Sequence, residues 1–463
     1  MRLFGTNGIR EVVGGTLDAR FVTDIVGAIA EVHEGKGTAI VGTDARTSSP
    51  ALGRIAAGTL AMAGMDVLEL GILPTPAIQY NVPRLHASFA VVITASHNPP
   101  EFNGIKGIAA DGLEFPRELE ERVEAAYAAR RGRTVDFARV GTITPVPDGA
   151  SRYVDGILSC VNVDRIRQRK LRVLVDCGNG TSTVSSPLLL QKLGVRYVAL
   201  NATFDGTFPG HLSEPTEANV AGTVRTVTAV GADFGVVHDG DADRSVFIDE
   251  KGRYIPGEKM LALFAREAVR AHPGGLVVTP VTSSDAVAEV IAPFGGSVLF
   301  TRVGSPVVAR AMQEHKAVMG GEENGGLIFA DHQLARDGAV TLAKVSEILA
   351  TTGQPLSELI DSLPPYHLVK EKVACPVPLR AKLLDAVPGL LDADSGGEVT
   401  RIDGVKVRTS KGWVLVRPSG TEPLCRIFAE SRDRAVAEEL ARGTARRVAS
   451  LVEDLERESL ARA

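Results

Sequence analysis

Aromatic side chains and positive charge are both scarce in this chain. Phe, Trp and Tyr make up 5% of its 463 residues, and 51 Lys and Arg stand against 56 Asp and Glu, which gives a net charge of −5. A protein that binds nucleic acid usually presents a basic surface and aromatic rings on which bases stack. We therefore expect no nucleic-acid partner.

Long apolar runs and closely spaced cysteines are missing as well. No stretch approaches the roughly 18 apolar residues that cross a bilayer, and residues 1–10 lack the charged flank and apolar run of a secretion signal. The four cysteines are scattered and form no Cys-x-x-Cys pair, so we expect free thiols rather than a zinc site. These absences favour a cytoplasmic protein without a membrane partner.

The chain contains an α/β pattern that occurs three times in succession. Runs rich in Val and Ile alternate with helical patterns, which favours α/β layers. The predicted strands of the three units are 38–44, 66–70, 89–94, then 172–176, 196–200, 234–238, then 276–279, 297–301 and 316–320. After residue 365 the pattern changes to strands at 405–408, 413–416 and 424–430 and a long helix, which indicates a smaller α+β unit.

Turn-rich connectors separate these units. We therefore predict three similar α/β domains with mixed sheets, at residues 1–149, 150–253 and 254–366, and a C-terminal α+β domain at 367–463. In each α/β unit the third strand runs into a polar or glycine-rich loop. Open α/β sheets bind ligands beyond the carboxyl ends of their strands, so these loops are predicted to face one shared cleft.

The loop of the second unit predicts a metal site. Asp239, Asp241 and Asp243 would repel one another unless a cation neutralised them, and their oxygens suit Mg²⁺. An EF-hand also begins with alternating acids, but Arg244 stands where that loop needs glycine. The alternative is a solvated acidic turn.

Ser96 ends the last strand of the first unit and precedes a stiff loop with two prolines. We expect an exposed side chain, as a nucleophile or phosphate carrier needs. The Gly-x-Ser-x-Gly elbow of α/β-hydrolases is absent there. A plain turn serine is the alternative.

Two further loops offer groups for a phosphorylated sugar. Arg417, Ser419, Gly420 and Thr421 lie between two predicted strands. A guanidinium, hydroxyls and a glycine suit a dianionic phosphate, although a plain hairpin is the alternative. The loop 322–324 offers acceptors and an amide for sugar hydroxyls, although an acidic turn would look the same.

Together the four loops resemble the α-D-phosphohexomutase superfamily, in its phosphoglucosamine mutase and phosphomannomutase branches. The resemblance covers the whole chain, from residues 4–10 to 417–423, and is most specific at 94–99 and 239–244. It implies four domains around a central cleft in a heart-shaped enzyme that interconverts hexose 6-phosphate and hexose 1-phosphate. The partner would be a small sugar phosphate, and the enzyme would be a monomer or homodimer.

The resemblance also implies residue roles. Ser96 would carry the phosphoryl group, one Mg²⁺ would bind phosphorylated Ser96 and the three aspartates, and a hexose 1,6-bisphosphate would be the intermediate. The residues implied beside the reacting groups are Arg10, His97, Lys106 and Arg244. The residues implied in substrate binding are Arg302, Glu322, Asn324, Arg417, Ser419, Gly420 and Thr421.

Two departures from the family pattern bear on the substrate. Many bacterial relatives have Ser-Gly-His where this chain has Asn324, Gly325 and Gly326, so a sugar contact or acid–base helper is either missing or supplied elsewhere, with His332 as a candidate. Residues 301–305 resemble the glucosamine branch, although relatives there usually carry Asp where Ser305 stands.

We therefore expect glucosamine 6-phosphate as the substrate and glucosamine 1-phosphate as the product. A phosphomannomutase/phosphoglucomutase of broad specificity is the first alternative. A metal-dependent sugar phosphatase and a non-catalytic sugar-phosphate binding protein are the others.

Overall fold

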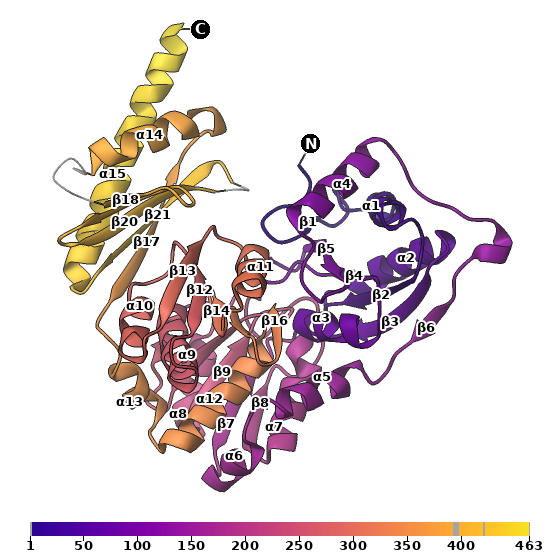
Figure 1. Ribbon diagram of the computed structural model, residues 1–463, viewed down its shortest axis with the longest axis horizontal. Helices are drawn as coiled ribbons and strands as arrows, with labels where there is room; N and C mark the ends of the chain where they lie inside the picture. The colour runs from indigo at the N-terminus through magenta and orange to yellow at the C-terminus, as the bar shows by residue number, and fades with distance from the viewer. Residues whose placement is uncertain (1, 392–397, 420–421, 463) are drawn as a thin grey trace.

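Four sheets, each flanked by helices, make up the computed structural model (Figure 1). It describes residues 2–391, 398–419 and 422–462, with side chains as far as residue 458. We call the segments that hold these sheets domains I to IV, in chain order. The prediction of three α/β units and a smaller C-terminal α+β unit is confirmed. Among the described residues, no helix is both long and apolar enough to cross a membrane.

Domain I is built on a six-stranded mixed sheet in the order β1-β5-β4-β2-β3-β6. Its strands are β1 (Ile9–Val12), β2 (Thr38–Thr43), β3 (Asp66–Ile72), β4 (Phe89–Ile93), β5 (Phe102–Ala109) and β6 (Ile143–Pro145). Its helices are α1 (Ala19–Val32), α2 (Ser49–Met62), α3 (Thr75–Arg84) and α4 (Arg117–Ala128), with a 3₁₀ turn η1 (Phe137–Arg139). Strand β4 is buried along its whole length, as its unbroken apolar sequence requires.

Domain II has a five-stranded sheet in the order β11-β10-β9-β7-β8. The strands are β7 (Arg172–Asp176), β8 (Arg196–Leu200), β9 (Phe234–His238), β10 (Ser245–Asp249) and β11 (Tyr254–Ile255). The helices are α5 (Gly149–Leu158), α6 (Val163–Arg169), η2 (Thr181–Val184), α7 (Ser186–Leu193) and α8 (Ala221–Ala229). Because β11 pairs with β10, this sheet extends two residues past the predicted boundary at 253.

Domain III repeats the plan with the order β13-β12-β14-β15-β16. The strands are β12 (Leu276–Pro280), β13 (Ser297–Thr301), β14 (Met319–Gly321), β15 (Leu327–Phe329) and β16 (Gln333–Arg336). The helices are α9 (Gly257–Ala271), α10 (Ala286–Ile291), η3 (Ala292–Phe294), α11 (Ser305–His315), α12 (Gly338–Thr352) and α13 (Leu356–Asp361).

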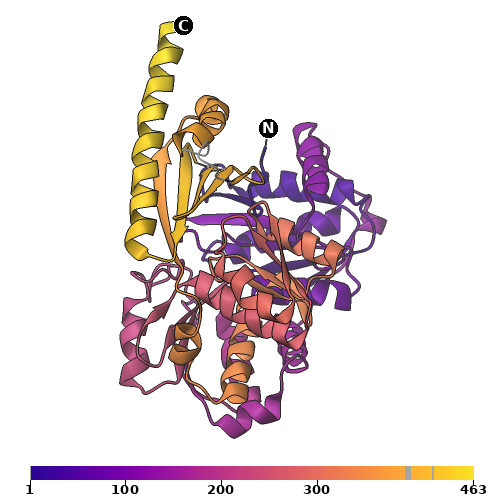
Figure 2. The same cartoon turned by 60° about the vertical axis from the view of Figure 1, so that its left-hand side comes forward.

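Domain IV is an antiparallel sheet in the order β17-β21-β20-β19-β18. The strands are β17 (His367–Ala374), β18 (Glu398–Thr400), β19 (Val405–Thr409), β20 (Gly412–Pro418) and β21 (Leu424–Ser431). The helices are η4 (Val377–Leu379), α14 (Arg380–Leu390) and α15 (Arg434–Arg462), and α15 stands against one side of the sheet (Figure 2).

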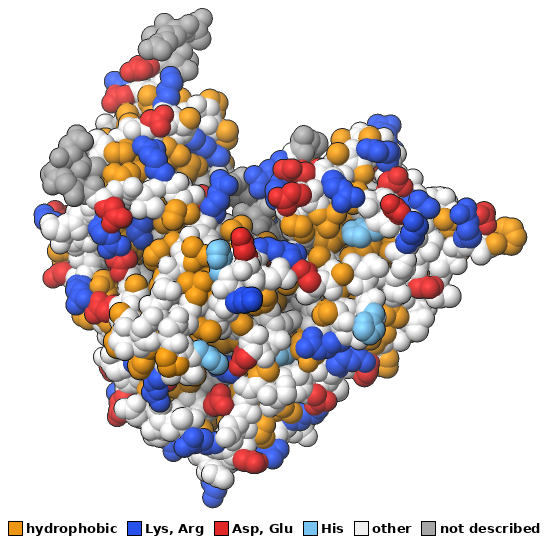
Figure 3. All heavy atoms as spheres, viewed as in Figure 1, with side chains coloured by type: hydrophobic (Ala, Val, Ile, Leu, Met, Phe, Trp, Pro, Cys, Tyr) orange, Lys and Arg blue, Asp and Glu red, His pale blue; other side chains and the backbone are white. Residues whose placement is uncertain are grey.

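The largest apolar core connects domains I to III, whereas domain IV has a core of its own. One continuous core runs from Ile40 in domain I through Tyr153 and Phe234 to Leu363 in domain III, so the first three domains are packed together. Domain IV has a core of its own and meets domain III through a small cluster around Trp413. The chain therefore forms an arc, and its surface is hollowed between domains IV and I (Figures 1 and 3).

A close approach of backbones also joins domains I and II. A Cβ atom at Gly206, in the loop between β8 and α8, would lie 2.1 Å from the backbone nitrogen of Thr47 and 2.6 Å from the carbonyl carbon of Arg46. Only a residue without a side chain fits there without moving one of the two domains.

We predict that Gly206→Ala destabilises the protein by about 1–3 kcal/mol, because the added methyl group overpacks this contact. The free energy of unfolding in urea measures the effect. Gly443→Ala, in the interior of α15, is the matched control and should be neutral or slightly stabilising, because a Cβ there would meet no neighbouring segment of the described chain within 4 Å. Equal stability of Gly206→Ala and the unchanged protein would contradict the close approach.

Candidate active site

The acidic loop joins two buried strands of domain II. Strands β9 and β10 run antiparallel with His238 opposite Ser245, and every residue of both is buried. Asp239, Asp241 and Asp243, here called the acidic triad, therefore turn inside the protein and are at most 2% exposed. The alternative of a solvated acidic turn is wrong.

Positively charged side chains from domains I and II pair with the acidic triad. Lys106, on β5 of domain I, places Nζ 2.8 Å from Asp241 Oδ2 and 3.5 Å from Asp243 Oδ2. Arg244, next to the triad in sequence, places Nε 3.0 Å from Asp239 Oδ2. These pairs offset part of the free energy that burying three carboxylates costs.

The triad also fits a metal ion. One ligand oxygen from each aspartate can be chosen so that all three lie within 4.8 Å of one another. Asp241 Oδ1 and Asp243 Oδ1 are buried and have no hydrogen-bond partner among the described residues. Buried carboxylate oxygens without a partner are costly, and hard oxygen ligands are those that Mg²⁺ prefers. The residues present therefore match the ion that the sequence predicts.

Burial and the neighbouring cations act in opposite directions on the pKa values of Asp239 and Asp241. Burial raises the pKa of Asp239 above its usual value, in spite of Arg244. Burial acts on Asp241 as well, but Lys106 and a hydrogen bond from Thr75 outweigh it, so the pKa of Asp241 falls below its usual range. Thr75, at the start of α3, donates from Oγ1 to Asp241 Oδ2 at 2.7 Å and from its backbone nitrogen to Asp241 O at 3.0 Å.

Ser96 lies directly against the triad. Its Oγ donates to Asp239 Oδ2 at 3.0 Å, which joins the loop of domain I to that of domain II. The residue has a positive φ of 52° and is 1% exposed. The expectation of an exposed serine is wrong, because domain II covers the end of β4.

Arg46 holds the backbone of the Ser96 loop. This fully buried guanidinium donates to four carbonyl oxygens, those of Ser96, Asn98, Pro99 and Phe102, at 2.6–3.0 Å. A hydrogen bond from Nε to Asp44 at 3.0 Å compensates its charge. The left-handed conformation of Ser96 therefore persists because its surroundings fix it.

Two other predicted residues line the same loop. Arg10, on β1, donates from Nη1 to Asn98 Oδ1 at 2.9 Å. His97 lies with Nδ1 3.4 Å from Ser96 Oγ. Burial first, and then Arg244 and Arg10, lower the pKa of His97 far below its usual value, so its imidazole is neutral.

Arg336, at the end of β16 in domain III, was not predicted from the sequence. Its Nη2 lies 2.5 Å from Asp243 Oδ2 and its Nη1 donates to Glu322 Oε2 at 2.8 Å. A Cβ at Gly326 would lie 2.3 Å from Arg336 Cδ. Arg336 therefore occupies the space in which a larger residue at position 326 would sit, and it links the triad to the loop of domain III.

His332 does not reach this site. Its ring stacks on Tyr80 with centroids 4.8 Å apart, and its Nδ1 lies 3.8 Å from Cys160 Sγ. Burial lowers the pKa of His332 to about 3. His332 therefore contacts Tyr80 and Cys160 rather than the triad, whereas the side chain of Arg336 fills the space beside Gly326.

The residues of domain III that were predicted to bind the sugar differ in their surroundings. Glu322 is 4% exposed and also accepts at Oε1 from the backbone nitrogen of Gly304 at 3.2 Å. Asn324 uses its Oδ1 to accept from Gly326 N at 3.1 Å, while Arg302 is exposed to solvent. The structure thus places Glu322 next to the 302–304 loop.

Arg417 of domain IV lies on the other side of the 302–304 loop. Its Nε donates to Asp403 Oδ2 at 2.7 Å, and the same oxygen accepts from Val303 N at 3.0 Å. Ser419 is buried at the end of the same strand segment. Gly420 and Thr421 lie outside the described residues.

Sequence reasoning missed three residues that hold the site: Thr75, Arg46 and Arg336. Each lies at or just beyond the carboxyl end of a strand, where open α/β sheets bind their ligands. That position in the sequence could have identified them. None belongs to a cluster of similar side chains, so composition alone did not mark any of them.

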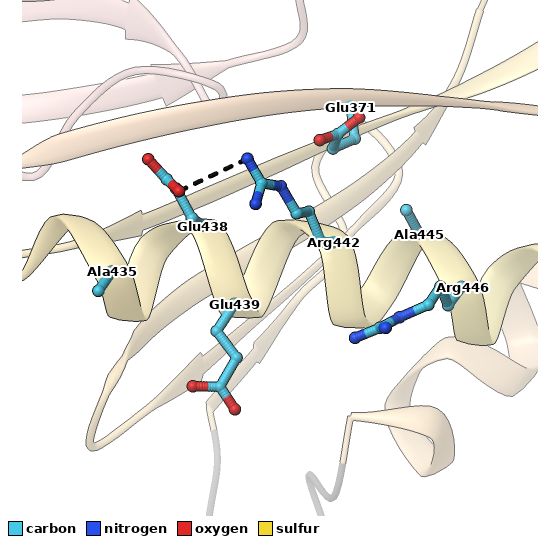
Figure 4. Close-up of a pocket in the computed structure, with 7 residues that line it drawn as sticks. All are labelled: Glu371, Ala435, Glu438, Glu439, Arg442, Ala445 and Arg446. Atoms are coloured by element: carbon cyan, nitrogen blue, oxygen red, sulfur yellow. Dashed lines mark ion pairs between the residues drawn. The ribbon is translucent and has the colours of Figure 1, made fainter.

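A second hollow of the surface, of about 610 Å³, lies along α15 next to β17 (Figure 4). Its lining carries both charges, and Arg442 pairs with Glu438 at 3.5 Å. It belongs to domain IV alone, whereas the triad, Ser96 and Arg336 come from three other domains. The triad is therefore the candidate active site.

Four family models match the chain in order. They are described as phosphoglucomutase/phosphomannomutase alpha/beta/alpha domain I at residues 1–133, domain II at 151–252, domain III at 256–366 and the C-terminal domain at 373–447.

Similar proteins match over almost their whole length. A protein of Thermococcus kodakarensis named phosphoglucomutase/phosphomannomutase is 40% identical over 442 residues, which cover 95% of this chain and 96% of the relative. A phosphoglucosamine/phosphogalactosamine mutase of Sulfurisphaera tokodaii is 37% identical over 453 residues, covering 95% and 97%. The crystal structure of a phosphoglucomutase/phosphomannomutase family protein from Burkholderia thailandensis has a TM-score of 0.86 and 28% identity, and covers 98% of both chains.

We predict that Asp241→Asn weakens Mg²⁺ binding by at least about tenfold, because it removes a charged ligand and leaves Lys106 without its closest partner. Calorimetric titration with Mg²⁺ measures the change. Asp164→Asn, whose side chain is 86% exposed on α6, is the control and should bind Mg²⁺ unchanged. An Asp241→Asn protein with the affinity of the control would remove the triad as the metal site.

Proposed function

We propose that this chain, which belongs to the phosphoglucomutase/phosphomannomutase family and is a phosphohexose mutase, acts preferentially on glucosamine phosphate. Members of this family depend on Mg²⁺ and a phosphoserine. The observation that carries the proposed assignment of residues is the contact of Ser96 Oγ with Asp239 Oδ2 at 3.0 Å. It puts the hydroxyl that would carry the phosphoryl group beside the oxygens that would hold the metal.

The proposed carrier is phosphorylated Ser96. Its Oγ–P bond breaks as the free hydroxyl of the sugar phosphate attacks, and a hexose 1,6-bisphosphate forms. After the bisphosphate has turned in the cleft, its other phosphate returns to Ser96 and leaves the isomeric monophosphate. The attacking hydroxyl loses its proton as its bond to phosphorus forms, and the departing Ser96 oxygen takes up a proton, so that protons balance over each transfer. The imidazole of His97, with Nδ1 3.4 Å from Ser96 Oγ, is a hydrogen-bond partner for that oxygen.

The acidic triad would hold one Mg²⁺, which supplies positive charge beside the transferring phosphoryl group. Lys106 and Arg244 add fixed positive charge on either side of the triad. Arg10 orients the Ser96 loop through Asn98. Arg46 keeps that loop rigid, so the donor oxygen stays in place through both transfers.

Substrate binding is assigned to the loops of domains III and IV. Arg417 would bind the phosphate that is not reacting, with Ser419, Gly420 and Thr421 in the same loop. Glu322, Asn324 and Arg302 would contact the sugar. Since the phosphate loop must accept either end of the bisphosphate, it fixes position without distinguishing the two phosphates.

The preference for an amino sugar rests on the surroundings of Ser305. Its Oγ donates to Glu114 Oε2 at 3.1 Å, and both residues line a small hollow that also includes Asp243 and Arg336. The carboxylate of Glu114 offers an acceptor for a protonated 2-amino group. The name of the Sulfurisphaera relative supports the same substrate class, whereas the name of the Thermococcus relative favours glucose and mannose phosphates.

We predict that Ser96→Ala abolishes steady turnover, a loss of at least about 10³-fold, while the fold is kept. The rate of conversion and the phosphate content of the protein are the two measurements. Ser159→Ala, at the exposed end of α5, is the control and should retain both. Substantial turnover by Ser96→Ala would show that another group carries the phosphoryl.

A substrate panel tests the proposed preference. The Mg²⁺-loaded protein is given glucosamine 6-phosphate, glucose 1-phosphate or mannose 1-phosphate, each with a trace of its 1,6-bisphosphate. We expect kcat/KM to be at least about tenfold higher for glucosamine phosphate, as one well-placed charge contact provides. Equal or faster conversion of the other two sugars would make the enzyme a general hexose-phosphate mutase. Free phosphate as the main product would favour a phosphatase.

A further inference from the structure

Asp403 touches two functional segments at once. It lies in the turn before β19, and its Oδ2 accepts from Arg417 Nε at 2.7 Å and from the backbone nitrogen of Val303 at 3.0 Å. Arg417 belongs to domain IV, whereas Val303 belongs to domain III. One carboxylate oxygen therefore bridges the proposed phosphate arginine and the proposed sugar loop.

The backbone of the same turn also fixes Arg417. Val405 pairs with Val416 across β19 and β20, which brings Gly404 next to Arg417. Gly404 has a φ of 84°, and a Cβ there would lie 2.4 Å from Val416 O and 2.9 Å from Arg417 Cα. The turn 403–404 therefore determines both where the Arg417 backbone runs and where its side chain points.

The segment 302–304 is a meeting point of three domains. Gly304 N donates to Glu322 Oε1 at 3.2 Å, within domain III. A Cβ at Gly304 would lie 3.0 Å from Thr6 Cγ2 of domain I. Ser305, the next residue, accepts from Asn7 Nδ2 at 3.0 Å. Asp403 adds the contact from domain IV.

A guanidinium that is held at Nε leaves its two terminal amino groups to bind another anion. The long side chain of a free arginine samples many rotamers, and ordering it on binding weakens affinity. A carboxylate that already holds Nε orders the side chain before the anion binds, so less conformational entropy is lost on binding. The Val303 bond ties the same carboxylate to domain III, so Arg417 is oriented when domain IV lies against the 302–304 loop.

We propose that Asp403 is a positioning residue that orients Arg417 toward the non-reacting phosphate and links it to the 302–304 loop. This inference rests on the proposed assignment of Arg417 to phosphate. Because that contact is made both before and during transfer, its loss should raise KM and leave kcat nearly unchanged.

A double-mutant cycle with Asp403→Asn, Arg417→Ala and the double variant tests this positioning role. We expect Asp403→Asn alone to raise KM by about five- to tenfold with kcat changed less than about twofold, the size of one charge-assisted hydrogen bond. In the Arg417→Ala background the same change should raise KM by less than about twofold, because no arginine is left to position. Asp385→Asn, also in domain IV and 82% exposed, is the matched control and should leave KM unchanged.

Gly404→Ala provides a second route to the same readout, and thermal unfolding of every variant checks its fold. The methyl group of Gly404→Ala should displace Arg417, so this substitution should raise KM only in a protein that still contains Arg417. Additive effects of Asp403→Asn and Arg417→Ala, or an unchanged KM in Asp403→Asn, would overturn the positioning role. An unchanged KM in Arg417→Ala would instead remove the phosphate assignment itself, and with it the inference.

Discussion

The balance of charge around three buried carboxylates is the constraint on which the rest of the structure depends. Asp239, Asp241 and Asp243 lie within a few ångströms of one another at almost no exposure. Isolated buried carboxylates of this kind would be protonated or would destabilise the fold strongly. Positive side chains must therefore reach these carboxylates. Domain II supplies Arg244, which directly follows the triad in the sequence. Lys106 from domain I and Arg336 from domain III complete the balance, which requires these domains to pack against domain II.

The same constraint shapes the loop that carries the serine. Ser96 must approach a cluster of carboxylates and also adopt a left-handed backbone conformation, which costs roughly 1–3 kcal/mol for a residue other than glycine. Arg46 compensates by binding four carbonyl oxygens of the loop while its own charge is paired with Asp44. A phosphoryl carrier, the role proposed for Ser96, needs a fixed position more than it needs exposure, and this loop fixes the buried serine.

The sequence predicted the parts of the site that are local and failed where distant segments meet. The strands at 172–176, 196–200 and 234–238 have the predicted ends, because short Val-rich runs between polar turns leave little choice of boundary. The edge strand β17 was missed, since its alternating pattern is half exposed and lies beside a connector. The spacing of the three aspartates indicated a metal site within one loop. Arg336 was missed because its position over Gly326 depends on how β15 and β16 pair, which composition does not determine.

Domain IV is attached by a different kind of interface, and this difference matches the two tasks of a mutase. Domains I to III share one apolar core, whereas domain IV meets domain III through the small Trp413 cluster and polar contacts such as Arg408 with Asp285. Apolar cores resist rearrangement, while a small and partly polar interface separates at lower cost. Phosphoryl transfer needs fixed groups, and the groups proposed for it come from domains I to III, which share that core. The proposed bisphosphate intermediate, which must turn around between two transfers, would need a phosphate site that releases and rebinds it. A three-domain body with a shared core and a separately packed fourth domain would meet both needs.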